Sequence, residues 1–146
     1  MEKPHYKVIL LVFASANQPL YDFFKKVYEA YMFESPDVKV FFTYGNNIRF
    51  DPQEYDFVAS VKESLGNPFA TTKVTEAMEF IHNNYSYDFM IRTNLSTFWD
   101  FNTMLKRLET LPKRMCFSGK HANFDHTRLS GIHMVMSPDV VKMVVD

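Results

Sequence analysis

Val8-Ile9-Leu10-Leu11-Val12-Phe13-Ala14 is the longest uninterrupted apolar run of the chain. A membrane-spanning helix needs about 20 apolar residues, so this run does not predict one. A strand buried on both faces of a parallel sheet is a short apolar run of this kind. Lys3 and Lys7 before the run and Ala14-Ser15-Ala16 at its end also imitate a secretory signal peptide. We favour the strand because the run is short for a signal core and a helix pattern follows it at once.

Strand and helix patterns alternate from this run to the end of the chain. Asn17 is a candidate cap and Pro19 suits the first turn of a helix. Apolar residues then recur at helical spacing over Leu20–Tyr31, Val74–Ile81 and Phe98–Leu111, and a last helix begins at Ser137. The expected strands are Val8–Ala14, Val38–Tyr44, Phe57–Val61, Tyr87–Thr93, Arg114–Ser118 and Ile132–Met136. Polar loops are expected over 46–55, 63–69 and 119–130. This alternation predicts an α/β domain with a mostly parallel sheet.

The composition excludes several classes of protein. A chain of 146 residues predicts one domain, and 47% hydrophobic with 23% charged residues is ordinary for a soluble globular protein. The net charge of −1 gives no electrostatic footprint for nucleic acid. Cys116 is the single cysteine, so neither an internal disulfide nor a cysteine zinc site is expected. The 4 glycines are scattered, which excludes GxGxxG and Walker loops, and GxSxG is absent from the sequence.

The two ends of the chain leave its cellular location open. The sequence contains no convincing signal peptide or transmembrane segment, which favours a soluble protein without fixing a compartment. The helix that begins at Ser137 spans barely two turns when the chain stops at Asp146. We therefore expect the domain to be incomplete at its C-terminus and to belong to a longer polypeptide.

Ligands of parallel α/β sheets bind at the carboxyl ends of the strands. This rule selects Ser15-Ala16-Asn17, Gly45-Asn46, Glu63 and Thr93–Ser96. Arg92 and Asn94 end an apolar strand, and such polar groups are unusual there unless they face a site. The alternative is an ordinary exit from the strand, with Asn94 or Ser96 capping the next helix.

The remaining charged groups give weaker signals. Glu63 is the best carboxylate candidate because it falls just past a predicted strand. Asp100 and Asp125 are isolated, as most solvated surface carboxylates are. His121, His126 and His133 lie close in sequence but lack a standard metal-ligand spacing, so loop and strand histidines are the favoured interpretation.

Three ordered motifs between Phe57 and Ser137 resemble the nucleotide-sugar-binding core of GT-A glycosyltransferases. Thr71–Thr75 with Ala77–Ile81 resembles the LTLKT helix of the β-1,3-galactosyltransferase-like branch. Tyr87–Asn94 resembles its yDyilKtD strand, and Ser130–Val141 resembles its SGxxYxxSxDxV segment. The motifs are also similar to those of relatives in large DNA viruses and algae. They cover just over half of the chain.

The resemblance implies a Rossmann-like GT-A fold and transfer of a sugar, such as a hexose, from a nucleotide-diphosphate donor to an acceptor hydroxyl. A glycan or a glycosylated protein is the implied acceptor. The net charge and the short apolar run, rather than the resemblance, predict no nucleic-acid partner and no membrane span. The family's DxD motif holds Mn²⁺ or Mg²⁺ on the diphosphate, which stabilises the leaving group. Here the two carboxylate positions fall on Asn94 and Ser96, and Arg92 replaces a lysine.

Three interpretations of this departure stay open. The donor site works without metal, with Arg92 and Lys73 supplying the positive charge. Alternatively, Glu63 holds the metal, or catalysis is lost. Lys73 also has a purely structural interpretation, as a solvated residue whose stem packs on the sheet. The family's catalytic base would follow Asp146, so the sequence names none.

The implied site has a donor side and an acceptor side. Donor-binding candidates are Ser15, Lys73, Arg92, Asn94 and Ser96, and the acceptor side would include Ser130 and Gly131. Two other functions compete with a transferase. One is a catalytically inactive module of the same fold that binds glycan or nucleotide sugar. The other is an unrelated α/β enzyme, such as a methyltransferase-like protein, which the lack of a glycine-rich first loop disfavours.

Overall fold

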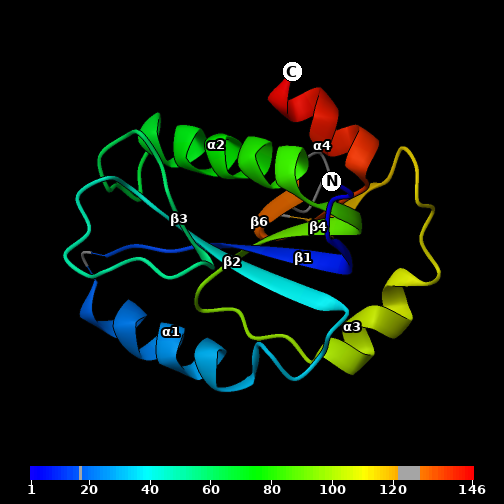
Figure 1. The fold of residues 1–146 in the computed structure, drawn as a ribbon, viewed down its shortest axis with the longest axis horizontal. Coiled ribbons are helices and arrows are strands. Elements are labelled where there is room, and N and C mark those ends of the chain that lie inside the picture. The colour runs from blue at the N-terminus through cyan, green and yellow to red at the C-terminus, as the bar shows by residue number, and fades with distance from the viewer. Residues whose placement is uncertain (17, 122–128) are drawn as a thin grey trace.

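The fold is seen in a computed structural model that describes residues 1–16, 18–121 and 129–146 (Figure 1). Within these residues, six strands form one sheet, and four helices cover it. The strands are β1 (His5–Phe13), β2 (Val38–Tyr44), β3 (Asp56–Val58), β4 (Ser86–Asn94), β5 (Phe117–His121) and β6 (Leu129–Met136). The helices are α1 (Pro19–Tyr31), α2 (Phe69–Asn84), α3 (Phe101–Leu108) and α4 (Pro138–Val145).

The sheet is mixed and mostly parallel, in the order β3-β2-β1-β4-β6-β5. Strands β3, β2, β1 and β4 are mutually parallel, whereas β6 runs antiparallel to both of its neighbours. The prediction of an α/β domain with a mostly parallel sheet is confirmed. The apolar run that begins at Val8 forms the central strand β1, and residues 8–12 are at most 1% exposed, as a strand buried on both faces requires.

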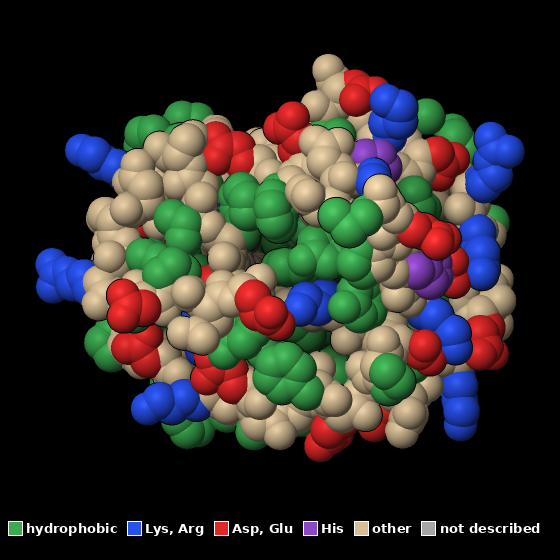
Figure 2. Space-filling view, in the orientation of Figure 1, with side chains coloured by type: hydrophobic (Ala, Val, Ile, Leu, Met, Phe, Trp, Pro, Cys, Tyr) green, Lys and Arg blue, Asp and Glu red, His purple; other side chains and the backbone are tan. Residues whose placement is uncertain are grey.

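Two helix layers sandwich the sheet, with α2 and α4 on one face and α1 and α3 on the other (Figure 1). Alternate residues of β1 serve the two layers. Val8, Leu10 and Val12 pack on the side of α1 and α3, while Ile9 and Leu11 pack on the side of α2 and α4. Apolar side chains gather in the middle of the face shown in Figure 2, between the two layers, where the surface is hollowed.

Several predicted boundaries move for identifiable reasons. The third strand was expected to reach Val61 but ends at Val58, because the N–H of Ser60 turns to a carboxylate oxygen of Glu76. The third helix was expected from Phe98 but begins at Phe101, because Asp100 accepts a hydrogen bond from the N–H of Thr103 and caps it.

The fifth strand was expected over Arg114–Ser118 but spans Phe117–His121. Met115 has a φ of 51°, a left-handed conformation that a strand cannot continue through. The loop expected over 119–130 is shorter than predicted, since its first residues belong to β5 and β6 begins at Leu129. Asn17, the expected cap of α1, lies outside the described residues, and Gln18 occupies the cap position.

The chain crosses over the sheet at one point that matters for binding. It passes from β1 outward to β2 and β3, then returns through α2 to β4 on the other side of β1. At their carboxyl ends, on the left of Figure 1, β1 and β4 therefore continue to opposite sides of the sheet: β1 leads to β2, and β4 leads toward β5 and β6. Such a switch point is where open α/β sheets bind ligands. No helix among the described residues has the length and apolar character needed to cross a membrane.

Candidate functional site

Arg92 and Asn94 end β4 at the switch point, beside the last residue of β1. Phe13 pairs with Asn94 in the parallel register of the two strands. Arg92 Nη1 donates to Asn94 Oδ1 at 2.9 Å, and the guanidinium lies 5.1 Å from the centroid of the Phe13 ring. Burial lowers the pKa of Arg92, but a guanidinium stays charged at neutral pH. A fixed, half-buried positive charge thus stands at the carboxyl edge of the sheet.

Lys73 reaches the same edge from α2 but is fully buried. Its Nζ lies 2.5 Å from Glu63 Oε1, donates to the carbonyl of Ala14 at 2.7 Å, and sits 4.2 Å from the Phe13 ring centroid. Burial lowers the pKa of Lys73, while the hydrogen bond to Glu63 opposes this effect. The interpretation of Lys73 as a solvated surface residue is wrong, because its side chain is 0% exposed.

The second oxygen of Glu63 is also engaged. Glu63 Oε2 accepts the N–H of Gly45 at 2.9 Å and that of Ala16 at 3.4 Å. A Cβ added at Gly45 would lie 2.2 Å from the backbone nitrogen of Glu63, so only glycine permits this approach. The Lys73–Glu63 pair therefore ties together the segments that follow β1 and β2 and the first turns of α2. This buried pair does not face solvent, and it holds the carboxyl edge of the sheet in place from within the protein.

Of the other predicted site residues, Ser15 and Ser96 follow the strands that form this edge, whereas Ser130 and Gly131 lie on the neighbouring strand β6. Ser15 is buried just after β1, and Ser96 is exposed two residues after β4. Leu95, between the two DxD-like positions, is buried in the core. Ser130 is half-buried on β6, and Ile132 donates its N–H to the Ser130 hydroxyl at 3.4 Å. Gly131 lies in the same strand, whose amino end runs toward the carboxyl edge of β4.

The described residues at this edge do not match the ligand set of Mg²⁺ or Mn²⁺, which prefer carboxylate oxygens. Asn94 and Ser96 are neutral, and the Asn94 oxygen already accepts from a cation. Both Glu63 oxygens are used within the protein. The described part of the chain contains no group of three His, Cys, Asp or Glu side chains arranged to hold a metal.

Two cavities flank the edge. Arg92 lines one of about 290 Å³, whose walls include Thr71 of α2 and Met134 of β6. The other, about 230 Å³, lies against the start of α1 and is lined by Ala16, Asp22 and Arg49. Arg49 could not be predicted as a site residue, because it sits in a polar loop whose path no periodicity predicts.

The remaining candidates take structural positions. Asp100 is exposed, as expected of a surface carboxylate, and it caps α3. The alternative in which Asn94 or Ser96 caps this helix is therefore wrong. His133 lies on β6, facing α3, with its ring centroid 4.9 Å from that of Trp99. Asp125 and His126 lie outside the described residues, as does the side chain of His121.

Comparison with protein-family models, with curated proteins and with solved structures finds no match for this chain. The site must therefore be interpreted from its own geometry and from the motif resemblance alone.

Proposed function

We propose that the chain binds a nucleotide-diphosphate sugar at the carboxyl ends of β1 and β4 and belongs to a glycosyltransferase of the GT-A type. The observation that carries the proposal is the position of Arg92 and Asn94 at the switch point of the sheet. A diphosphate needs positive charge and hydrogen-bond donors at a place that solvent can reach. Arg92 carries a planar guanidinium, whose fork of N–H donors matches the geometry of phosphate oxygens.

Of the two cations expected to face the phosphates, Arg92 is the stronger candidate. Lys73 is fully buried and saturated by Glu63 and a backbone carbonyl, so its role is to position the edge. We propose that Arg92 takes the charge-stabilising role that a divalent metal has at a DxD motif. Asn94 then orients the guanidinium through its amide oxygen, and the exposed Ser96 adds a hydroxyl group. Ser15 is buried just after β1, so its role would be to position the edge.

A second candidate function is an inactive module that binds glycan or nucleotide sugar. The neutral Asn94 and Ser96 favour it, because the site then lacks the carboxylates that hold the metal in the resembling family. The described residues also offer no assigned base to deprotonate an acceptor hydroxyl. Release of UDP from a bound donor in the presence of acceptor sugars would separate the transferase from the module.

Calorimetric titration with UDP, GDP and UDP-glucose, each with and without Mn²⁺, tests the donor site. We expect binding of at least one nucleotide that is indifferent to Mn²⁺. Arg92→Gln should weaken it about 10- to 100-fold, since hydrogen bonds to charged groups are worth about 1.5–3 kcal/mol. Arg114→Gln is the matched control, because Arg114 is exposed and precedes β5 near the opposite end of the strands.

The outcomes separate the interpretations. Binding that strengthens sharply with Mn²⁺ would assign the charge to a carboxylate-held metal and remove the role proposed for Arg92. An equal loss in Arg92→Gln and Arg114→Gln would indicate a general effect of charge. No binding by the folded wild-type chain would overturn the donor site.

A further inference from the structure

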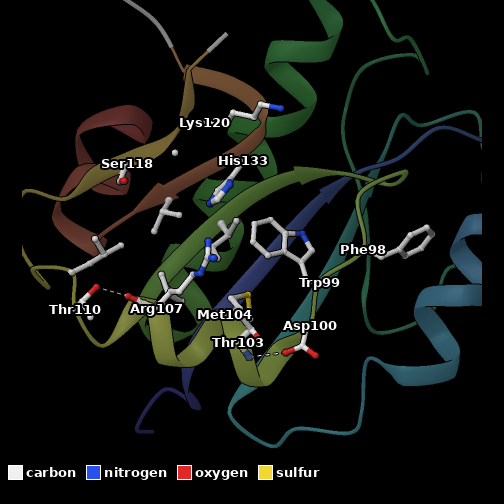
Figure 3. Close-up of a pocket in the computed structure, with 15 residues that line it drawn as sticks. Phe98, Trp99, Asp100, Thr103, Met104, Arg107, Thr110, Ser118, Lys120 and His133 are labelled. Carbon is white, nitrogen blue, oxygen red and sulfur yellow. Dashed lines mark hydrogen bonds between the residues drawn. The ribbon is translucent and has the colours of Figure 1, made fainter. Parts of the chain in front are cut away.

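A cavity larger than the two that flank the carboxyl edge lies on the face of the sheet opposite to Arg92. It measures about 640 Å³ and opens between α3 and the strands β4, β5 and β6 (Figure 3). This volume falls in the range of small-molecule sites. None of the residues proposed for the donor site lines this cavity, so its ligand chemistry follows from its own lining.

Three basic side chains from three different elements line the cavity. Arg107 comes from α3, Lys120 from β5 and His133 from β6. Figure 3 shows Arg107 reaching from α3 toward His133, with Lys120 beyond His133. Among the described residues, neither the Arg107 nor the Lys120 side chain has a hydrogen-bond or ion-pair partner. Asp100, the carboxylate of the lining, is occupied in capping α3.

The rest of the wall is apolar and is held in place. Met104 and Leu108 of α3 face Ile91 and Val135 of the sheet across the cavity. Trp99 closes one end, and its indole N–H donates to Thr93 Oγ1 at 3.2 Å. Thr93 in turn donates to the carbonyl of Ile132 at 2.8 Å, so the indole is anchored to both β4 and β6. The ring stands edge-on to His133, at an interplanar angle of 87°.

We infer that this cavity is a second binding site, for a small amphipathic anion. Its carboxylate, sulfonate or phosphate group would lie between Arg107 and Lys120, and its apolar or aromatic body would pack on Trp99 and Met104. The charge is complementary, because Arg107 and Lys120 are exposed cations at the rim of an apolar pocket, and neither is paired within the described residues. The proposal does not depend on the donor site, which lies beyond the sheet on the side of α2.

Trp99 makes the site directly observable, since it is the one tryptophan of the chain. The probe is anilinonaphthalene sulfonate, an aromatic body that carries one anionic group. We expect saturable binding with quenching of Trp99 emission and energy transfer to the probe. Phenylnaphthylamine, which lacks the sulfonate, should bind about tenfold or more weakly, because an anion loses its charge-assisted hydrogen bonds.

Two variants on the same helix test the role of charge. Arg107→Gln should weaken the sulfonate probe about tenfold and leave phenylnaphthylamine unchanged. Lys106→Gln removes the same charge from the neighbouring residue, which is exposed and outside the cavity lining, and should have little effect. Lys120→Gln provides a second test from β5, and circular dichroism verifies that each variant is folded.

The proposal is overturned by absence of energy transfer from Trp99, or by equal affinity for the charged and the neutral probe. Equal losses in Arg107→Gln and Lys106→Gln would also overturn it. Displacement of the probe by inorganic phosphate at concentrations as low as those at which the probe itself binds would show that the apolar body contributes nothing, which contradicts the amphipathic ligand. None of these results bears on nucleotide binding at Arg92, so the two proposals fail separately.

Discussion

At the scale of single residues, the Lys73–Glu63 pair holds together the segments that form the carboxyl edge of the sheet. Both side chains are 0% exposed, and their charged atoms are 2.5 Å apart. A buried ion pair does not by itself show that the charges stabilise the fold, because desolvation offsets the attraction. Removing one partner is different, since it strands the other charge in the interior. Removing one partner should therefore lower the free energy of unfolding by much more than the pair itself contributes, and this difference can be measured.

We predict that Lys73→Met lowers the free energy of unfolding by about 3–5 kcal/mol, because it leaves Glu63 buried and unpaired. Urea denaturation measures the change. Lys142→Met is the matched control. Lys142 forms an ion pair with Asp146 at the same 2.5 Å, but both side chains are at least 60% exposed. An exposed pair is worth about 1 kcal/mol or less. A loss in Lys73→Met no larger than in this control would show that the buried charge is not stranded.

At the scale of elements, the end of β4 is where the sequence was most informative. Arg92 and Asn94 could be predicted as site candidates because polar groups interrupt an apolar strand at its carboxyl end. Their direct hydrogen bond could not be predicted, since it depends on side-chain conformation. The Lys73–Glu63 pair escaped prediction for another reason. The loop that carries Glu63 has no periodicity, and its approach to Gly45 depends on tertiary packing.

The neutral residues after β4 yield a gain-of-function prediction. Asn94→Asp combined with Ser96→Asp introduces two carboxylates at the positions that correspond to the DxD motif of the resembling family. We expect calorimetry to detect Mn²⁺ binding that the wild-type chain lacks, because carboxylates are the preferred ligands of hard cations. Nucleotide binding should become dependent on Mn²⁺. The exposed Asn102 of α3 supplies the control, Asn102→Asp. If the introduced carboxylates only pair with Arg92, the variant gains no Mn²⁺ affinity, and the DxD comparison fails.

At the scale of the whole molecule, the two faces of the sheet carry different chemistry. The α2 face presents Arg92 at the switch point, whereas the α3 face holds the larger cavity with Arg107 and His133. The alternating apolar and polar segments predicted both helix layers. The cavity could not be predicted, because its lining comes from elements far apart in sequence. In particular, the antiparallel placement of β6 between β4 and β5 brings His133 opposite α3.

Two histidines, His82 on α2 and His133 on β6, make the free energy of unfolding depend on pH. Burial lowers the pKa of His82 and of His133 below the ordinary value near 6.5, and Arg107 adds to the effect at His133. In the unfolded chain both histidines therefore take up protons at a higher pH than in the folded protein. Because the unfolded state then binds more protons, the free energy of unfolding falls as pH drops through 6.5. The fall ends once the pH is below the folded pKa values.

Urea denaturation between about pH 7.5 and 5 measures this slope. The double variant His82→Gln with His133→Gln should show a flatter dependence of the free energy of unfolding on pH. Above pH 7 both histidines are neutral in the folded and unfolded chain, so their pKa shifts contribute nothing to the difference in stability between variant and wild type. An unchanged slope in the double variant would assign the pH dependence to other groups.

The anion proposed for the cavity supplies a further check at His133. A bound anion favours the protonated ring, so saturating anilinonaphthalene sulfonate should raise the pKa of His133 and reduce its share of the slope. The His82 share should stay, because His82 lies on α2, on the opposite face of the sheet from the cavity.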